Sequence, residues 1–219
     1  MKAGSRYDGI FYLPHKCAGG INEVLIPIFF SFRAKRVEDE NLVVADRFSP
    51  PGVEDIVLGK EIFLLREITT AGEVVLVKSS VERDNEGNIL MKVNPKERIL
   101  ENRSFDRYAF CPEELGEFQV FKGEKEEPIG SAYITDISLS GAEFFSSTVP
   151  LSSINVGDVI VVKQKGKQMK LELVRKRENK ARHIIYFAGK IVETNFNLMN
   201  YLMTNYVKVI KDILLANKF

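Results

Sequence analysis

Residues 74–93, VVLVKSSVERDNEGNILMKV, contain two apolar runs rich in β-branched residues, separated by a polar stretch. The runs Val74–Val81 and Ile89–Val93 have the length and composition of strands. The stretch between them, residues 83–88, contains Gly87, and glycine adopts positive φ values without steric cost. These residues therefore predict an antiparallel strand pair joined by a hairpin loop, and with it a mainly β fold.

Short runs of the same kind continue on both sides of this hairpin. Upstream they are Leu42–Ala45, Ile56–Leu58 and Ile62–Ile68, and downstream they are Tyr108–Cys111, Phe118–Phe121, Ser131–Thr135, Ala142–Phe145, Val159–Lys163, Met169–Lys176 and Ile184–Val192. Each run is bounded by Gly, Pro, Asn, Asp or Ser, the residues that form turns. Gly189, inside the last run, predicts a bulge or a close approach of another backbone. The pattern favours small antiparallel barrels.

The N-terminal region is less regular. Residues 1–20 are rich in Gly and Pro, so no element is predicted there, and part of the segment is expected to be disordered. Residues 21–32 are apolar enough to be buried, but their period alone does not distinguish helix from strand. Residues 33–41 are charged and are expected to form a connector.

The C-terminal region carries a different period. Apolar residues recur at spacings of three and four over residues 196–217. This spacing places them on one face of a helix, so one amphipathic helix is predicted, packed across the end of a barrel. Its polar face is not strongly basic, which disfavours a role at a membrane surface.

Composition bounds the possible functions. The chain has 219 residues, enough for two domains, and 31 Lys and Arg against 30 Asp and Glu give a net charge of +1. Proteins that bind nucleic-acid polymers usually carry a clear basic excess, so no such partner is expected, and any phosphate site must be local. The longest apolar run, residues 24–32, is under half the length needed to span a bilayer, and no secretory signal is evident. A cytoplasmic protein is expected.

Neither a metal centre nor catalysis is predicted. Cys17 and Cys111 form no C-x-x-C or zinc-type spacing, so both are expected to be free, reduced thiols. His15 is expected to lie in a surface loop rather than in a metal site, and His183 to be structural. The sequence contains no Walker-type loop and no nucleophile elbow, so we expect neither an enzyme nor a cofactor.

Two short polar motifs suggest a ligand site. In Arg103-Ser-Phe-Asp-Arg107 the two arginines are four residues apart, so in an extended segment both guanidinium groups project from one face. A guanidinium matches the oxygens of a phosphate or the O6/N7 edge of guanine. In Asp136-Ile-Ser138-Leu-Ser-Gly141 the carboxylate can accept the N1–H and amino hydrogens of guanine, the hydroxyl can donate or accept, and the glycine lets the backbone approach a ligand. Together they predict a site for an anionic guanine nucleotide.

In order and spacing, these motifs resemble the two signatures of the PilZ domain, a family that binds the bacterial second messenger cyclic di-GMP. The resemblance implies that Arg103 and Arg107 hold phosphate and guanine, that Asp136 and Ser138 contact a guanine, and that Gly141 shapes the turn. Two positions depart from the common pattern of the family. Many members have Arg or Gln where this chain has Asn102, and many have Gly-Gly where it has Ser140-Gly141.

The same resemblance implies a domain organisation and a fold. The β-rich region before the first motif looks like the split-barrel partner domain of flagellar-brake-type PilZ proteins. The expected domains are residues 1–95, a linker at 96–102, and a PilZ domain of residues 103–219. The fold class is then mainly β: an N-terminal split barrel and a C-terminal six-stranded antiparallel barrel, with the C-terminal helix.

Three functions follow as hypotheses. The first is a cyclic di-GMP receptor that changes its interdomain arrangement on binding and regulates motility, adhesion or surface behaviour through a protein partner, such as a motility or secretion component. The second is a degenerate PilZ adaptor that binds a protein and no nucleotide, which the intact Arg103, Arg107, Asp136 and Ser138 disfavour. A separate alternative for the motifs themselves is that the two arginines form a solvated basic edge and residues 136–141 merely build a turn. The third, binding of single-stranded nucleic acid, is disfavoured by the charge balance.

Overall fold

The computed structural model describes residues 1–17, 23–39, 41–68, 74–101, 106–123 and 125–216. The chain divides into two compact units. The first consists of Met1–Leu13, Pro27–Ser104 and Ile210–Phe219, and the second of Pro14–Ile26 and Phe105–Val209. The expected division into residues 1–95, a linker and residues 103–219 stays a prediction.

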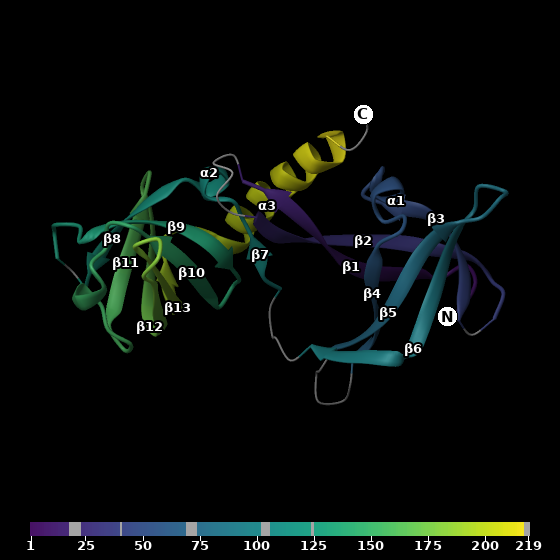
Figure 1. Cartoon of the computed structure of the whole chain (residues 1–219), viewed down its shortest axis with the longest axis horizontal. Coiled ribbons are helices and arrows are strands. Elements are labelled where there is room, and N and C mark those ends of the chain that lie inside the picture. Colours follow the sequence, from purple (N-terminus) through teal and green to yellow (C-terminus); the bar gives the residue numbers. More distant parts are fainter. Residues whose placement is uncertain (18–22, 40, 69–73, 102–105, 124, 217–219) are drawn as a thin grey trace. The chain divides into compact units, whose positions relative to one another are not determined.

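The first barrel is a ring of antiparallel strands (Figure 1). Within the described residues its strands are β1 (Arg6–Lys16), β2 (Glu23–Val37), β3 (Leu42–Ser49), β4 (Glu61–Ile68), β5 (Val74–Arg83) and β6 (Ile89–Glu101). Their order around the ring is β1-β2-β3-β6-β5-β4, and pairing of β1 with β4 closes it. The predicted hairpin is present as β5 and β6, and Gly87 in its loop has a φ of 84°.

Aromatic side chains fill this barrel. Phe11 and Phe32 are fully buried and Phe30 nearly so. The rings of Phe11 and Phe30 meet edge to face with centroids 5.8 Å apart, and Phe30 stacks on Phe32 at 6.2 Å. Burying one such side chain contributes roughly 1.5–3 kcal/mol, so each of these rings stabilises the barrel. Gly9 leaves the space that the ring of Phe30 occupies, since a Cβ there would lie 2.6 Å from Cζ of Phe30.

Three expectations for the N-terminal region were wrong. His15, expected in a surface loop, lies near the end of strand β1. Residues 6–16, for which no element was predicted, form β1, because closing the ring supplies β1 with partners that local sequence does not reveal. The charged residues from Arg33 onward are not a connector but the second half of β2, which ends at Val37. There Arg33 donates to both carboxylate oxygens of Asp46 on β3, at 2.8 and 2.6 Å, so a charged outer face is compatible with a strand.

Two further segments differ from expectation. Residues 56–58 are not a strand, since the short helix α1 (Val53–Ile56) follows the turn at Pro50-Pro51-Gly52. Residues 94–101 extend β6 beyond the predicted run Ile89–Val93 and pair with β5, with Arg98 opposite Val77. Lys96, Glu97 and Arg98 are exposed, and Oε2 of Glu97 is 3.1 Å from Nζ of Lys78.

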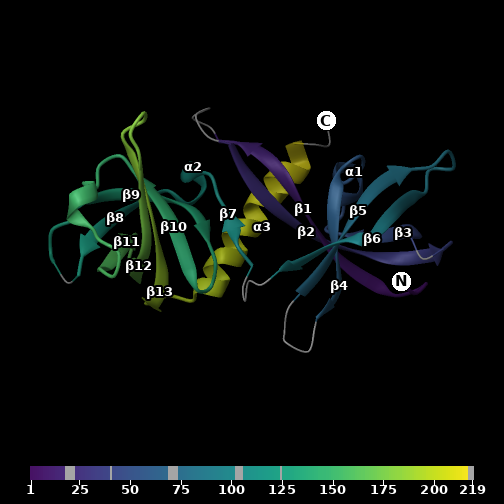
Figure 2. The ribbon, with the colours of Figure 1, turned by 60° about the horizontal axis from the view of Figure 1, so that its bottom comes forward.

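The second barrel confirms the six-stranded prediction (Figures 1 and 2). Among the described residues its strands are β8 (Glu117–Lys122), β9 (Gly130–Ile137), β10 (Gly141–Ser146), β11 (Val159–Gln164), β12 (Lys167–Asn179) and β13 (Ile184–Thr194). They run in the order β10-β13-β12-β11-β8-β9, and β9 pairs with β10 to close the barrel. A short strand β7 (Tyr108–Ala109) pairs with Asp136 and Ile137 at the end of β9, and a 3-10 turn occupies Leu151–Ser153.

The interior of this barrel is also aromatic. Phe118, Phe144 and Phe187 are buried, and Phe144 stacks on Phe187 with ring centroids 5.3 Å apart. Gly189 on β13 is a close approach, as the sequence predicts: a Cβ there would lie 2.9 Å from Cβ of Leu171 and 3.0 Å from the carbonyl oxygen of Glu172. Strands β12 and β13 can therefore approach this closely only with glycine at 189.

The C-terminal helix is present as α3 (Leu198–Ala216). Its buried residues recur at spacings of three and four, as predicted: Leu198, Leu202, Tyr206, Val209, Ile210 and Ile213. In the second unit the ring of Tyr206 meets Tyr108 edge to face, with centroids 5.0 Å apart. None of the helices in the described part of the chain is long and apolar enough to cross a membrane.

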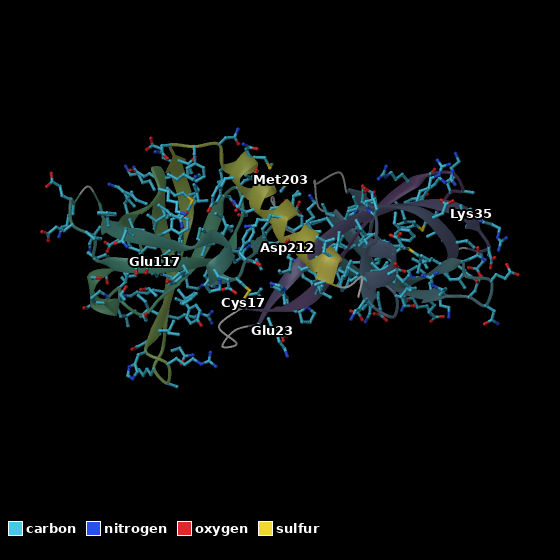
Figure 3. All side chains as sticks on the ribbon, turned by 90° about the horizontal axis from the view of Figure 1, so that it is seen from above. Cys17, Glu23, Lys35, Glu117, Met203 and Asp212 are labelled. Atoms are coloured by element: carbon cyan, nitrogen blue, oxygen red, sulfur yellow. A yellow bond between two sulfur atoms is a disulfide. The ribbon has the colours of Figure 1, made fainter. Side chains whose placement is uncertain are left out.

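The two cysteines are joined, contrary to the prediction of free thiols. Cys17 and Cys111 form a disulfide with their Cα atoms 5.3 Å apart across a sequence separation of 94 residues (Figure 3). Cys17 follows the end of β1, and Cys111 precedes the short helix α2 (Pro112–Leu115). No local spacing motif signals a pair this distant, because only the fold brings the two segments together.

Candidate functional site

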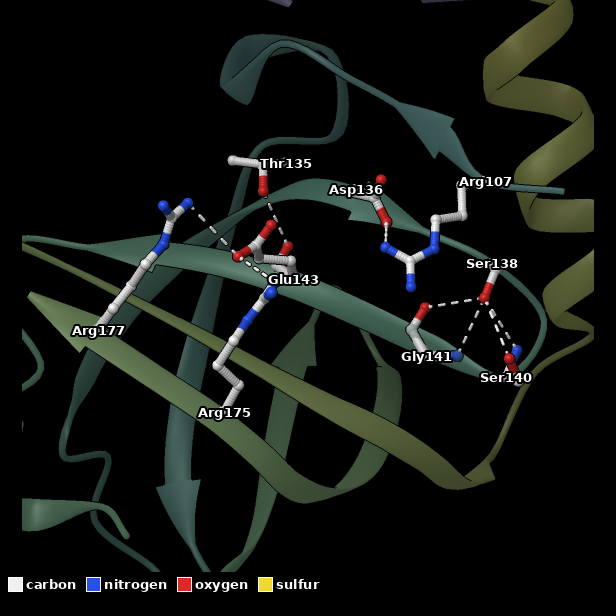
Figure 4. Close-up of polar contacts among 9 residues, drawn as sticks. All are labelled: Arg107, Thr135, Asp136, Ser138, Ser140, Gly141, Glu143, Arg175 and Arg177. Carbon is white, nitrogen blue, oxygen red and sulfur yellow. Dashed lines mark hydrogen bonds and ion pairs between the residues drawn. The ribbon is translucent and has the colours of Figure 1, made fainter. Parts of the chain in front are cut away.

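The turn between β9 and β10 is organised by Ser138. Its side-chain oxygen accepts hydrogen bonds from the backbone N–H groups of Ser140 and Gly141, both at 3.2 Å. Its own N–H donates to the carbonyl oxygen of Gly141 at 2.8 Å. Ser138 is only 5% exposed. The hydroxyl therefore holds the backbone of the turn in place (Figure 4).

Arg107 lies beside Asp136 in the second barrel. It immediately precedes β7, which pairs with β9 so that Ala109 lies opposite Asp136. Nη1 of Arg107 is 3.6 Å from Oδ1 of Asp136, and the arginine side chain is 49% exposed. Tyr108 anchors the segment: it is buried, and that burial, together with the charge of Asp106, raises the pKa of its phenol. The guanidinium is thus held beside the carboxylate but remains open to solvent.

A β-bulge turns Asp136 towards the outer surface of the barrel. In β9, Ala132 and Ile134 face the core, so strict alternation would also bury residue 136. The pairing with β10 shifts, however: Ile134 is opposite Phe144, but Asp136 is opposite Glu143, which leaves Thr135 as the extra residue. The bulge therefore places Ile137 in the core and Asp136 outside.

A second bulge acts in the same way on β12. Leu171 and Leu173 face the core, and the pairing with β13 then skips Val174, so that Arg175 is opposite Ala188. Arg175 is consequently 59% exposed, and its Nη2 donates to Oε1 of Glu143 at 2.9 Å. Bulges occur often beside binding sites, where they redirect side chains. Here two of them direct an aspartate and an arginine outwards.

These side chains line one hollow of about 560 Å³ on the second unit. Its lining combines the β9–β10 turn with outward residues of β12 and β13: Arg107, Asp136, Ser140, Gly141, Ala142, Glu143, Val174, Arg175, Ala188, Gly189 and Lys190. Figure 4 shows Arg107 beside Asp136, and Arg175 and Arg177 both reaching towards Glu143. Nη2 of Arg177 is 3.7 Å from Oε1 of Glu143, and its guanidinium covers the ring of Tyr186.

The motif residues have different places in this arrangement. Arg107, Asp136 and Gly141 lie together in the lining of the hollow. Ser138 does not line it and instead supports the turn. Gly141 is in the lining without a positive φ, and a Cβ there would lie 3.1 Å from the carbonyl oxygen of Gly189. Arg103 and its neighbour Asn102 lie outside the described residues.

Sequence reasoning missed three charged residues of the lining: Glu143, Arg175 and Lys190. Glu143 could have been predicted to face outwards near the turn, because it lies two residues after Gly141 and alternates with the buried Ala142 and Phe144. Arg175 carried none, since the bulge that exposes it is not visible in the sequence.

The hollow can bind an anion that also presents hydrogen-bond donors. Arg107, Arg175 and Lys190 supply cations, and Asp136 and Glu143 supply acceptors. A guanidinium can bind two phosphate oxygens at once, whereas a carboxylate suits two adjacent N–H donors. The described lining contains no cysteine or histidine.

Comparisons with known proteins identify similar structures but no sequence relatives. No protein-family model matches the sequence, and no curated protein matches it significantly. The Bacillus subtilis inhibitor of motility MotI/DgrA aligns over 97% of this chain and 99% of its own, with 12% identity and a TM-score of 0.37. Escherichia coli YcgR in complex with c-di-GMP aligns over 97% and 87%, with 13% identity and a TM-score of 0.38. The K. pneumonia MrkH–c-di-GMP complex aligns over 97% and 89%, with 16% identity and a TM-score of 0.33.

Proposed function

We propose that this protein is a cyclic di-GMP receptor whose ligand binds in the hollow beside the β9–β10 turn. The observation that carries the proposal is that Arg107, Asp136 and Gly141, which come from the two PilZ-like motifs, lie together in that lining. Cyclic di-GMP presents phosphodiester oxygens and guanine edges, which are the two kinds of group that these side chains complement.

Each residue has a distinct role in this proposal. Arg107, which is half-exposed, exchanges its 3.6 Å contact with Asp136 for a phosphate or a guanine edge of the ligand. Asp136 then accepts the N1–H and amino hydrogens of guanine. Ser138 acts by holding the turn rather than by touching the ligand, and Gly141 keeps the hollow open. Arg103 supplies a second guanidinium from the first motif.

Binding is proposed to be read out by the first unit. Ligand binding changes the arrangement of the two units, and the changed surface regulates a protein partner of the motility or secretion apparatus. A ligand can shift such an equilibrium only as far as its affinities for the two arrangements differ. The change is measurable as a difference in radius of gyration by small-angle X-ray scattering with and without cyclic di-GMP.

Calorimetry on the purified chain tests the binding step. Cyclic di-GMP is titrated beside GTP and the linear dinucleotide of the same composition. The proposal expects saturable binding of the cyclic form, at least about ten-fold tighter than of either control, because only the cyclic form holds both guanines and both phosphates in one preorganised shape. Absence of binding for all three, in a protein shown to be folded, would favour the adaptor that binds a protein partner without nucleotide.

A further inference from the structure

A second group of polar side chains lies around the disulfide, on a different part of the second unit. His15 and Cys17 come from the end of β1, and Cys111 and Glu114 come from the start of α2. Nε2 of His15 is 3.3 Å from Oε1 of Glu114. The ligand-type atoms of His15, Cys111 and Glu114 all lie within 4.8 Å of one another, and Cys17 is bonded to Cys111. Two short segments, H-x-C and C-x-x-E, therefore converge.

The cluster is largely withdrawn from solvent and partly fixed in orientation. Cys111 is fully buried and Cys17 is 6% exposed. Glu114 is 16% exposed, and its second oxygen, Oε2, accepts the backbone N–H of Cys111 at 2.6 Å. That hydrogen bond leaves Oε1 directed at His15. A carboxylate held this way by a backbone donor resembles the oriented ligands of protein metal sites.

We propose that, once the disulfide is reduced, His15, Cys17, Cys111 and Glu114 bind one Zn²⁺ ion. Two thiolates, an imidazole and a carboxylate form a four-ligand set of the kinds that zinc takes in proteins, and the thiolates select against Mg²⁺ and Ca²⁺. With all four positions filled by protein, the ion would be structural: it would join the β1 end to the α2 segment in place of the disulfide. This site is independent of the nucleotide site.

The exchange of disulfide for zinc balances in two steps. A dithiol reductant gives two electrons and two protons to the S–S bond, which yields two cysteine thiols and leaves the reductant as a disulfide. Zn²⁺ then displaces the thiol protons, so loading releases two protons to solvent while the imidazole binds through its neutral nitrogen. In a reducing compartment, where disulfides do not persist, the metal form would therefore connect the same segments.

Cobalt titration of the full chain tests the site. The protein is stripped of metal, reduced with a phosphine under argon and titrated with Co²⁺, a spectroscopic substitute for Zn²⁺. We expect one equivalent to bind with thiolate charge-transfer and tetrahedral d–d bands, which Zn²⁺ then abolishes. The oxidised chain should show neither band. Equal Co²⁺ binding by the two forms, or no thiolate band in the reduced form, would overturn the proposal.

Variants identify the ligands. Cys17→Ser and His15→Ala should each weaken Co²⁺ binding at least about ten-fold, because each removes one metal–ligand bond. His183→Ala, which removes the histidine of the β12–β13 turn, is the matched control and should change nothing. Glu114→Gln against Glu113→Gln decides which carboxylate binds, since Glu113 also lies within 4.8 Å of both sulfur atoms. A thiolate band unchanged in both Cys17→Ser and His15→Ala would contradict the site.

A measurement on the unmodified chain covers the case in which a variant does not fold. In the reduced wild-type protein, one equivalent of Zn²⁺ should slow alkylation of both thiols by iodoacetamide at least about ten-fold, because bound thiolates are poor nucleophiles. Alkylation of both cysteines at the same rate with and without Zn²⁺ would count against the proposal, whatever the variants do.

Discussion

Asp136 and Glu143 lie directly opposite each other on β9 and β10, and each carboxylate has an arginine beside it. Like charges in facing positions destabilise a strand pair. Here Arg107 approaches the first carboxylate at 3.6 Å and Arg175 approaches the second at 2.9 Å. The hollow is therefore lined by two carboxylates and two guanidinium groups. An anionic ligand can change which carboxylate, or which ligand group, each guanidinium contacts.

Arg107→Ala should weaken cyclic di-GMP binding about ten- to a hundred-fold. A hydrogen bond to a charged group contributes about 1.5–3 kcal/mol, and this side chain is proposed to make such bonds to the ligand. Calorimetry measures the loss. Arg83→Ala, which removes an exposed arginine paired with Asp55 at 3.0 Å in the first barrel, is the control and should leave the affinity unchanged. Wild-type affinity in Arg107→Ala would remove this residue from the site.

Asp136→Asn should reduce affinity for guanine ligands without lowering the melting temperature. An amide brings its own donors and cannot accept two N–H groups as a carboxylate does. Because Asp136 faces Glu143, loss of its charge also relieves a repulsion in the ligand-free protein. Calorimetry and thermal denaturation are compared on the same samples. A lower melting temperature with unchanged affinity would mean that Asp136 only supports the turn.

Glu143→Gln should strengthen binding of the anionic ligand by up to about five-fold. Glu143 holds the guanidinium of Arg175, and an exposed ion pair of this kind contributes about 0.2–1 kcal/mol, which the ligand must otherwise displace. The double variant Glu143→Gln/Arg175→Ala should lose the gain, because no arginine is then released. If the single variant binds more weakly than wild type, Glu143 itself contacts the ligand.

Gly189→Ala should lower the free energy of unfolding by about 1–3 kcal/mol, the usual cost of forcing an extra methyl group into a packed site. Its Cβ would lie 2.9 Å from Cβ of Leu171 and 3.0 Å from the carbonyl oxygen of Glu172, both on the neighbouring strand β12. Gly141→Ala, with a single contact at 3.1 Å, should cost less. Urea denaturation ranks the two. An equal loss for both would show that the β12–β13 approach is not the tighter one.

Asp158→Asn should lower the melting temperature at pH 7 and have progressively less effect as the pH falls. The hydrogen bond from Lys122, at 2.7 Å, and that from the N–H of Asn155, at 2.8 Å, lower the pKa of Asp158. A depressed folded-state pKa stabilises the protein above the unfolded value of about 3.9, and the contribution disappears as the pH falls through the folded value. Thermal denaturation from pH 7 to about pH 2 measures this, and a difference independent of pH would exclude the ionic mechanism.

The sequence alone determined the elements whose cause is local. Short β-branched runs bounded by polar turns predicted each described strand of the second barrel, and Gly87 predicted the hairpin between β5 and β6. The apolar spacing of residues 196–217 predicted the helix observed at Leu198–Ala216. These elements can be predicted from the sequence because the hydrophobic period and the preferences of turn residues depend only on residues close together along the chain.

Only the tertiary structure decided which side chains meet. Alternation would bury Asp136 and Arg175, but the bulges at Thr135, in the pairing of β9 with β10, and at Val174, in the pairing of β12 with β13, bring both to one hollow. In the same way, Cys17 meets Cys111 across 94 residues. Strand register, and which distant segments come into contact, depend on closing the whole barrel. The free energy of closing it cannot be estimated from any short run of residues.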